Sequence, residues 1–324
     1  MSAFVDCIND PGLPTLPAVL NPLELGEHLR ESLPSQTKGL KEIQVRLLRH
    51  HVGKRCVVEI TLRATEGSSS LIGKVYAKDR SDIHQLMEEI SRAGFGPCEE
   101  FSIPQPTAYL PALHLLLQER VEGRPAKESF LSDNESERTA AAERCARWLA
   151  RFHAIAPRME PIFHLSNHLV SIDRWFGRLA SPGEPFADKA GELFKRLEAA
   201  ASELHRIEMC ATHGSYNHHQ VILAQGRTVA FDWDKYGLAD PNRDVARFVV
   251  ALRRLALRCL GSFHALDAAV EVFLKTYLCG GRPEVLANLQ FFGAATCLKL
   301  AQYDVNRRQA TLEEGLRILE QGFR

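Results

Sequence analysis

The sequence lacks three features that would mark a specialised class of protein. No Cys-x-x-Cys pair occurs among its eight cysteines, so neither a zinc site nor a disulfide framework is expected. No apolar run approaches the roughly 18 residues that a membrane-spanning helix needs. Lys and Arg together number 40, as do Asp and Glu, so no net charge favours nucleic acid or a membrane surface as a partner.

These absences favour a protein of the reducing cytoplasm. The first residues include Asp6 and Asp10 and no basic segment before a long apolar run, so we expect no secretory signal peptide. Cys210, Cys259 and Cys297 lie among apolar residues and are predicted to be buried, free thiols. The 324 residues are 45% hydrophobic and 25% charged, which is typical of a globular protein with one large or two modest domains.

The most informative stretch spans residues 212–246. It opens with a polar loop at 213–220, whose sequence is His-Gly-Ser-Tyr-Asn-His-His-Gln. Two short β-rich runs follow, joined across a Gln-Gly pair, and they predict a hairpin. Asp232 and Asp234 come directly after the second run. A polar loop followed by a carboxylate after a strand is typical of phosphoryl-transfer sites. In such sites the loop meets the acceptor hydroxyl and the carboxylate holds Mg²⁺.

This stretch resembles the catalytic segment of the aminoglycoside phosphotransferase and choline kinase-like families. Their pattern is His-Gly-Asp-x-x-x-x-Asn, then Ile-Asp-Trp/Phe-Asp/Glu, then Gly-Asp-Pro-x-x-Asp-Leu-Ala. Residues 231–234 (Phe-Asp-Trp-Asp) and 239–246 (Ala-Asp-Pro-Asn-Arg-Asp-Val-Ala) match it closely. The loop departs at Ser215, where the families have the catalytic Asp, and at Gln220, where they have a metal-binding Asn. Gln keeps an amide oxygen for a metal, whereas Ser cannot act as a carboxylate base.

The resemblance implies an α+β, two-lobed, protein kinase-like fold. Residues 1–119 would form an N-lobe with a small antiparallel sheet and an N-terminal extension. Residues 120–324 would form a mainly helical C-lobe that carries the catalytic and metal segment 212–246. Residues 1–20 contain three prolines and are expected to form an irregular lead-in.

The resemblance also implies a nucleotide site in the N-lobe. Three β-rich runs, the last of them at 71–77, are followed by a helical pattern at 82–92, as at the start of a kinase small lobe. Lys74 of the third run would bind the α- and β-phosphates of ATP and pair with a helix glutamate, either Glu88 or Glu89. The apolar stripe of that helix does not decide between the two. No Gly-rich phosphate loop is present, and residues 50–55 hold a single glycine in its place.

An apolar run at 112–121 turns polar at Gln118 and Glu119 and is broken at Gly123. This pattern indicates the hinge between the lobes, where backbone groups of Gln118, Glu119 and Arg120 would contact adenine; an ordinary strand end is the alternative. The sequence beyond it predicts helices at 137–155, 169–179, 188–204, 245–260, 265–278, 283–303 and 312–323.

Asp232 is the strongest candidate metal ligand, with Gln220 as the second. Asp234 is either another metal ligand or an ion-pair partner. His213 is expected to shape the loop through a backbone hydrogen bond. Asp240 and Asp244 are expected to be structural, because carboxylates are favoured at Asp-Pro turns and helix N-termini.

The activity implied is ATP- and Mg²⁺-dependent phosphoryl transfer to a hydroxyl group of a small molecule. Ser215 leaves three interpretations open. The protein is a slow or substrate-assisted kinase in which Ser215 orients the acceptor, or it uses another base such as His218 or Asp234. The third is a pseudokinase that binds nucleotide or a metabolite. Residues 236–324 hold 12 Lys and Arg against 9 Asp and Glu, which disfavours a polycationic aminoglycoside and favours a neutral or anionic acceptor.

Overall fold

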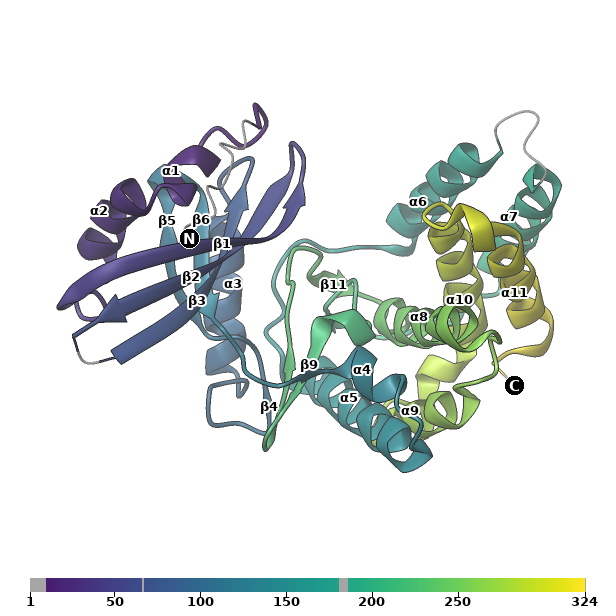
Figure 1. Cartoon of the computed structure of the whole chain (residues 1–324). Coiled ribbons are helices and arrows are strands. Elements are labelled where there is room, and N and C mark those ends of the chain that lie inside the picture. The colour runs from purple at the N-terminus through teal and green to yellow at the C-terminus, as the bar shows by residue number, and fades with distance from the viewer. Residues whose placement is uncertain (1–9, 66, 181–185, 324) are drawn as a thin grey trace. The chain divides into compact units, whose positions relative to one another are not determined.

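The computed structural model describes residues 10–65, 67–180 and 186–323 of the chain (Figure 1). The chain divides into two units, Met1–Glu122 and Gly123–Arg324. The boundary predicted from the sequence lies three residues earlier, at 119/120. Within the described ranges, none of the helices combines the length and the apolar character needed to cross a membrane.

The first unit is built on a five-stranded antiparallel sheet in the order β1-β2-β3-β6-β5 (Figure 1). The β1–β2 turn needs Gly53, whose φ of 68° lies in the left-handed region. The three predicted β-rich runs are confirmed as strands, each longer than its apolar stretch. The strands of this unit are β1 (Leu40–His51), β2 (Arg55–Ala64), β3 (Gly67–Tyr76), β4 (Phe101–Ser102), β5 (Pro106–Leu110) and β6 (Leu115–Glu119).

Two helices, α1 (Leu16–Leu20) and α2 (Pro22–Ser32), pack into one core with the sheet. The Asn21 side chain accepts a hydrogen bond from the Leu23 backbone N–H at 3.0 Å and so caps the N-terminus of α2. The prediction of an irregular lead-in holds for residues 10–15 and is wrong for Leu16–Leu20, which form α1. A proline in the first turn of a helix removes no intrahelical hydrogen bond, so Pro17 is compatible with α1.

The other face of the sheet carries Lys74. Side chains alternate across a strand, and Leu71 and Val75 of β3 point into the core with α1 and α2. Lys74 therefore points to the opposite face, where its register partners are Val57 of β2 and Leu116 of β6. The remaining helical elements of this unit are α3 (Ser81–Arg92) and a 3₁₀ turn at Pro111–Leu113.

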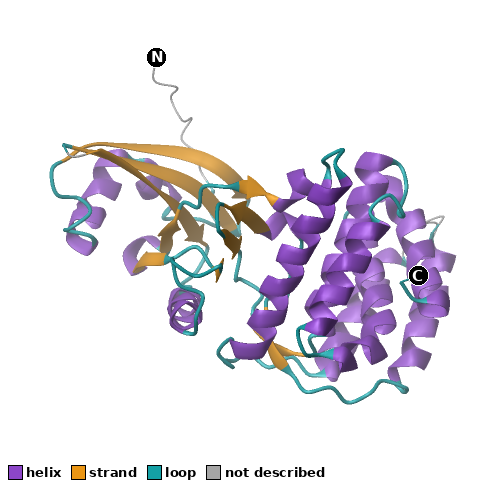
Figure 2. Cartoon of the chain, turned by 90° about the horizontal axis from the view of Figure 1, so that it is seen from below, coloured by secondary structure: helices purple, strands orange, loops and turns teal. Residues whose placement is uncertain are grey.

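The second unit is mainly helical (Figure 2). Its strands are short, and β8 pairs with β11 while β9 pairs with both β10 and β7. The helices are α4 (Ala126–Phe130), α5 (Glu135–Ile155), α6 (Leu165–Leu179), α7 (Ala187–Ala201), α8 (Asn242–Leu260), α9 (Asp267–Cys279), α10 (Leu286–Ala301) and α11 (Arg308–Gln321). The strands are β7 (Arg124–Pro125), β8 (Cys210–Thr212), β9 (Val221–Ala224), β10 (Arg227–Ala230) and β11 (Gly237–Ala239), and 3₁₀ turns span His218–Gln220, Pro283–Val285 and Val305–Arg307.

An aromatic cluster on α5 anchors the segment 212–246. The Trp148 ring stacks on Tyr216 with centroids 5.4 Å apart and contacts Trp233 at 6.0 Å. The Tyr216 hydroxyl donates a hydrogen bond of 2.8 Å to the Cys145 backbone oxygen. Because both ends of the predicted loop and hairpin rest on one buried helix, their backbone is fixed from the inside.

The cysteine prediction holds for Cys210 and Cys297, which are buried and free, and is wrong for Cys259, which is exposed. Cys259 lies in the last turn of α8, beyond Ala256, the last buried residue of that helix. Leu255 and Ala256 belong to the buried face of α8, whereas Cys259 and its neighbour Leu260 do not.

Candidate functional site

The hairpin predicted at 221–231 is confirmed as β9 and β10, paired from Val221–Ala230 to Ala224–Arg227. An antiparallel hairpin brings the residue before its first strand next to the residue after its second. The Phe231 backbone N–H accordingly donates to the Gln220 backbone oxygen at 3.0 Å. This pairing places Gln220 and Asp232, which are twelve positions apart in sequence, at the same end of the hairpin.

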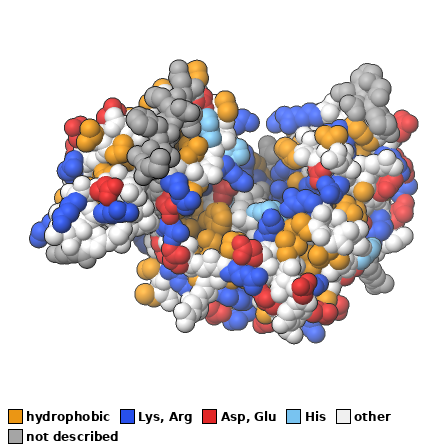
Figure 3. All heavy atoms as spheres, in the orientation of Figure 1, with side chains coloured by type: hydrophobic (Ala, Val, Ile, Leu, Met, Phe, Trp, Pro, Cys, Tyr) orange, Lys and Arg blue, Asp and Glu red, His pale blue; other side chains and the backbone are white. Residues whose placement is uncertain are grey.

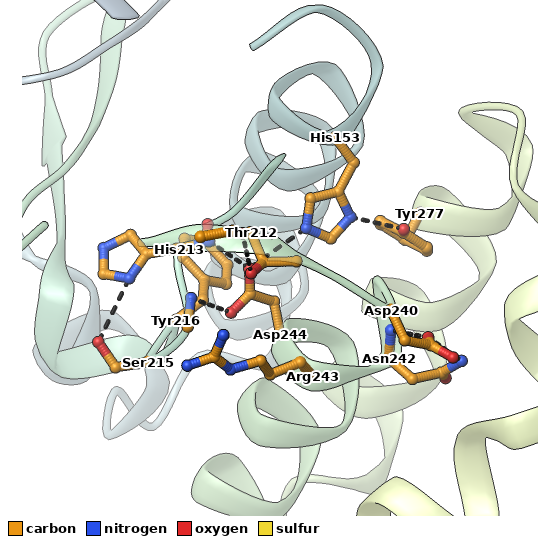
Figure 4. A network of polar contacts seen from close by, with 12 residues as sticks. His153, Thr212, His213, Ser215, Tyr216, Asp240, Asn242, Arg243, Asp244 and Tyr277 are labelled. Atoms are coloured by element: carbon orange, nitrogen blue, oxygen red, sulfur yellow. Dashed lines mark hydrogen bonds and ion pairs between the residues drawn. The ribbon is translucent and has the colours of Figure 1, made fainter. Parts of the chain in front are cut away.

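Asp244, near the N-terminus of α8, fixes the loop (Figure 4). Its carboxylate accepts from the backbone N–H groups of His213 and Gly214 at 2.6 and 2.8 Å and lies 3.3 Å from Nε2 of His153. His153 Nδ1 lies 2.8 Å from the hydroxyl of Tyr277. Burial raises the pKa of Asp244, but the hydrogen bond and charge of His153, with His213 and Arg243, outweigh it, so that pKa is lowered. Asp244 therefore has a structural role, as expected, and His153 shares it.

Ser215 is hydrogen-bonded to two members of the loop. His213 Nε2 lies 3.0 Å from the Phe231 backbone oxygen, and because a carbonyl only accepts, Nε2 carries the proton. In the neutral ring Nδ1 is then an acceptor, and it lies 3.3 Å from Ser215 Oγ. Gln220 Nε2 donates to the same Oγ at 3.1 Å. The hydroxyl of Ser215 is thus aimed at an imidazole nitrogen, and its oxygen still accepts hydrogen bonds.

Gln220 and Asp232 fit a Mg²⁺ site. Gln220 Nε2 lies 3.3 Å from Asp232 Oδ2, and Gln220 Oε1 accepts from Asn217 Nδ2 at 3.0 Å. Metal binding would require the terminal amide to rotate, which would exchange these hydrogen bonds and the one to Ser215 for a metal contact. One carboxylate and one amide oxygen suit Mg²⁺, which keeps waters or phosphate oxygens as its other ligands. Asp232 has a φ of 77°, a strained conformation that clusters at functional sites. Among the described residues no three His, Cys, Asp or Glu side chains gather as a metal site, so a metal here would depend on phosphate ligands.

The other proposed bases lie differently. Asp234 is partly buried in the turn that follows Asp232, and its role remains a prediction. His218 is buried, and burial, with His219 and three cations nearby, holds its pKa well below the ordinary value. The hydrogen bonds of Ser215 described above run to His213 and Gln220 and reach neither of these residues.

In the first unit, Lys74 and Gln118 lie on the neighbouring strands β3 and β6 and are 6% and 5% exposed. Glu88 and Glu89 each form an ion pair with Arg92, at 3.4 and 2.5 Å, so the pairing of either with Lys74 remains a prediction. The predicted hinge residues Glu119 and Arg120 form hydrogen bonds and ion pairs with other residues of the first unit. The backbone N–H of Glu119 donates to Gln105 at 2.8 Å, and Arg120 pairs with Glu59 and Glu122.

A cavity of about 920 Å³ within the second unit was not predicted from the sequence. It adjoins the loop, because Gly214 and Lys235 belong to its lining. The rest of the lining comes chiefly from α6, α8 and α10, which lie far apart along the chain. The only sequence signal was the excess of basic residues after 236, and this excess did not show which side chains face a common space.

The first unit has an antiparallel sheet with a buried lysine on one strand. The second unit is mainly helical and holds the polar loop and a carboxylate directly after the hairpin. These are the features of an α+β kinase-like phosphotransferase. The chain belongs to the phosphotransferase enzyme family, whose sequence profile matches residues 62–287. The kinase-like fold predicted from the resemblance, with an N-terminal antiparallel sheet and a mainly helical C-terminal part, is confirmed. No curated protein sequence matches the chain.

Solved structures of the same fold bind different compounds. A choline/ethanolamine kinase family protein from Mesorhizobium loti is 16% identical, with 92% of each chain covered and a TM-score of 0.58. A glucosamine kinase in complex with glucosamine, ADP and inorganic phosphate is 16% identical over 93% of this chain and 86% of that one, with a TM-score of 0.62. An amicoumacin kinase in complex with AMP-PNP and Ca²⁺ is 15% identical over 92% and 95%, with a TM-score of 0.54. At these identities the likeness shows the fold alone.

Proposed function

We propose that this phosphotransferase moves a phosphoryl group from ATP to a hydroxyl group of a small molecule that is not a polycationic aminoglycoside, with Mg²⁺ as the metal. The observation that carries the proposal is the contiguous set Ser215–Gln220–Asp232, linked at 3.1 and 3.3 Å and held by the buried Asp244. The nucleotides and Ca²⁺ bound by the glucosamine and amicoumacin kinases support ATP and a divalent cation as its cofactors.

The proposal assigns binding roles in each unit. In the first, Lys74 binds the α- and β-phosphates with Glu88 or Glu89 as its partner, and the backbone of residues 118–120 contacts adenine. In the second, Asp232 and Gln220 hold the metal. A metal held by these two residues would supply positive charge beside the transferred phosphoryl group.

Ser215 would orient the acceptor. Its oxygen accepts a hydrogen bond from the acceptor hydroxyl while its own O–H donates to His213 Nδ1. As the phosphoryl group moves, the acceptor proton passes to Ser215 Oγ and the Ser215 proton passes to Nδ1 of His213. The carboxylate of Asp244, which holds the backbone N–H of His213, stabilises the resulting imidazolium. Phosphoryl transfer depends mainly on positioning and electrostatics, so this weaker base slows the reaction without abolishing it.

One observation favours a second candidate, a nucleotide-binding pseudokinase. Ser215 has no carboxylate, and its oxygen already contacts two loop residues. A general base contributes about 10²–10⁴-fold to a rate, so its loss would leave binding intact and turnover near background. Turnover with a panel of hydroxyl compounds separates this candidate from the weakened kinase.

Thermal unfolding with and without Mg²⁺ and ATP tests both candidates at once. A ligand that binds only the native state stabilises it by RT ln(1 + [L]/Kd), about 2.7 kcal/mol at a hundred times Kd. We expect the melting temperature to rise with millimolar Mg²⁺ and ATP together and to rise less with ATP in EDTA. A folded protein whose melting temperature does not respond to ATP would refute both.

A further inference from the structure

Almost all of the charged side chains that line the cavity beside the catalytic loop are cations. Lys and Arg side chains gather between α6 and α8 on the face seen in Figure 3. Only one acidic residue, Asp240, belongs to the lining. The basic residues are Arg174, Arg178, Arg206, Lys235, Arg243, Arg247 and Lys299.

Three of these cations, Arg243 and Arg247 of α8 and Lys299 of α10, are partly buried. Arg243 and Arg247 lie one turn apart on α8, so both point to the same side of that helix. Nη1 of Arg243 and both Nε and Nη1 of Arg247 are inaccessible to solvent and have no hydrogen-bond partner. A buried donor without a partner costs about 1–3 kcal/mol, and more for a charged group. These guanidinium donors therefore suit a ligand that can accept several hydrogen bonds.

The carboxylate of Asp240 in the lining hydrogen-bonds to asparagines, not to these cations, and Asp244, outside the lining, offsets only part of their charge. The Asp240 carboxylate accepts from the backbone and side-chain N–H groups of Asn242 at 2.8 and 3.0 Å and from the side chain of Asn288 at 3.2 Å. Burial lowers the pKa of Lys299 to about 7, and Arg247 and Arg243 add to the effect. The pKa of Arg247 falls to about 10, again first through burial. The cations thus repel one another across a shared space.

The same space reaches the catalytic loop. Arg243 Nη2 lies 3.5 Å from the Lys235 backbone oxygen, and its guanidinium lies over the Phe163 ring at 4.1 Å. A Cβ on Gly214 would come within 3.0 Å of Arg243 Nη2 and clash with the Lys235 oxygen, so only glycine fits there. Gly214 precedes Ser215, and a compound in the cavity would therefore lie next to the proposed acceptor position.

We propose, on the basis of the function proposed above, that this cavity binds the acceptor and that the acceptor carries an anionic group, a carboxylate or a phosphate ester. Arg243, Arg247 and Lys299 hold that group. His168 offers Nε2, which is buried and has no hydrogen-bond partner. The rings of Trp175 and Phe292 also belong to the lining and would contact the carbon skeleton, and Lys299 Nζ lies over the Trp175 ring, 5.2 Å from its centroid. A polycation would meet repulsion from all three inner charges.

The test uses compounds that share one skeleton: glucosamine, glucose, glucuronate and glucose 6-phosphate, with inorganic phosphate as the simplest anion. Each is titrated without nucleotide into the wild-type chain and into Arg247→Met and Lys299→Met, and thermal stabilisation is measured. Arg258→Met is the matched control, because Arg258 lies on the same helix, is exposed and is outside the cavity lining. Arg247→Lys keeps the positive charge and tests whether the position tolerates a different side chain.

We expect at least one of the anions to stabilise the wild type and the Arg258→Met variant, and the neutral and cationic sugars to do so more weakly or not at all. Affinity for that anion should fall about ten- to a hundredfold in Arg247→Met and Lys299→Met, as for a lost charge-assisted hydrogen bond. Arg247→Lys should recover part of it.

Two results would overturn the inference: no stabilisation by any of the anions at millimolar concentration, or equal stabilisation of the wild type and the two cavity variants. Stabilisation by Mg²⁺ and ATP, measured in the same samples, reports on the proposed function separately. A chain that binds Mg²⁺ and ATP but none of the anions contradicts the anionic acceptor alone. One that binds the anions but no nucleotide contradicts the phosphotransferase proposal and with it the acceptor role of the cavity.

Discussion

Asp232 combines a metal-ligating side chain with a left-handed backbone, and this combination decides how it is best tested. An alanine at a φ of 77° would add strain of its own, whereas Asn tolerates this region nearly as well as Asp. We predict that Asp232→Asn removes the Mg²⁺-dependent part of ATP binding because it removes the carboxylate charge. Unfolding stability should change by less than about 1 kcal/mol, since Asn fills the same space. Calorimetric titration of ATP with and without Mg²⁺ measures the effect.

Asp234→Asn is the matched control two residues away. If it leaves Mg²⁺-dependent binding near the wild-type level, Asp232 is the ligand and Asp234 is not. Unchanged Mg²⁺-dependent affinity in Asp232→Asn would show that the metal assignment is wrong.

Ser215 decides how fast the proposed reaction runs. We predict that Ser215→Asp raises kcat by about tenfold or more, because a general base is worth about 10²–10⁴-fold when well placed, and an introduced one delivers part of that. Steady-state rates on a hydroxyl acceptor measure it, with Ser215→Asn as a control of similar size and no charge. A lower kcat in Ser215→Asp than in the wild type would mean that the site relies on another base and that the added charge repels the phosphate.

At the scale of elements, Asp244 connects α8, α5 and the loop. We predict that Asp244→Asn lowers the unfolding free energy by about 2–4 kcal/mol, because it removes a buried acceptor of backbone and imidazole hydrogen bonds. Chemical denaturation measures this, and the exposed Asp173→Asn on α6 should change stability by less than about 0.5 kcal/mol. Equal stability of the two variants would rule out the anchoring role of Asp244.

The same residue predicts an effect of acid. The folded-state pKa of Asp244 lies below its ordinary value of 3.8, so the carboxylate contributes stability above that value. This contribution is lost as the pH falls through the folded-state pKa. The wild type should therefore lose more stability below about pH 4 than Asp244→Asn does. Parallel losses in the two proteins, measured by denaturation at several pH values, would contradict the assignment.

The elements that could be predicted are those whose signal is local. The hairpin β9–β10, the strands β1–β3 and the cap of α2 all follow from neighbouring residues, and so does the position of Asp232 after a strand. The helix α1 was missed because prolines weigh against a helix wherever they occur, although a proline in the first turn costs nothing. Ser215 could be located by motif, but its contact with His213 Nδ1 depends on the loop conformation that Asp244 imposes.

At the scale of the whole second unit, the cavity could not be predicted because its lining comes from helices that are far apart in the sequence. His168, Arg247 and Lys299 come from three helices, and no periodicity within one helix shows that they face each other. Exposure of Cys259 was missed for a similar reason, since the faces of α8 are defined by what packs against them.

The positive charge of Lys299 in that cavity should lower the unfolding free energy of the protein. The folded-state pKa of Lys299 is about 7, well below its ordinary value of 10.5, so its protonation favours the unfolded state. This penalty is fully present below pH 7 and fades as the pH rises toward 10.5. We predict that Lys299→Met raises the unfolding free energy by about 1–3 kcal/mol at pH 6 and by less at pH 9, after allowance for its partial exposure.

Denaturation of both proteins across this pH range measures the difference. Arg243, Arg247 and Lys235 supply the surrounding positive charge, and Asp244 opposes it in part. A Lys299→Met variant that is less stable than the wild type at pH 6 would show that the charge of Lys299 is no net cost to the folded protein.

The proposed activity is metal-dependent transfer of a phosphoryl group from ATP to a hydroxyl group of a small molecule. ³¹P NMR of the chain with ATP, Mg²⁺ and the acceptor that stabilises it most tests this directly. We expect a new phosphomonoester resonance with the wild type, faster growth of that resonance with Ser215→Asp, and none in EDTA or with Asp232→Asn. Binding of Mg²⁺ and ATP without any phosphomonoester in either the wild type or Ser215→Asp would contradict it and leave the pseudokinase as the function.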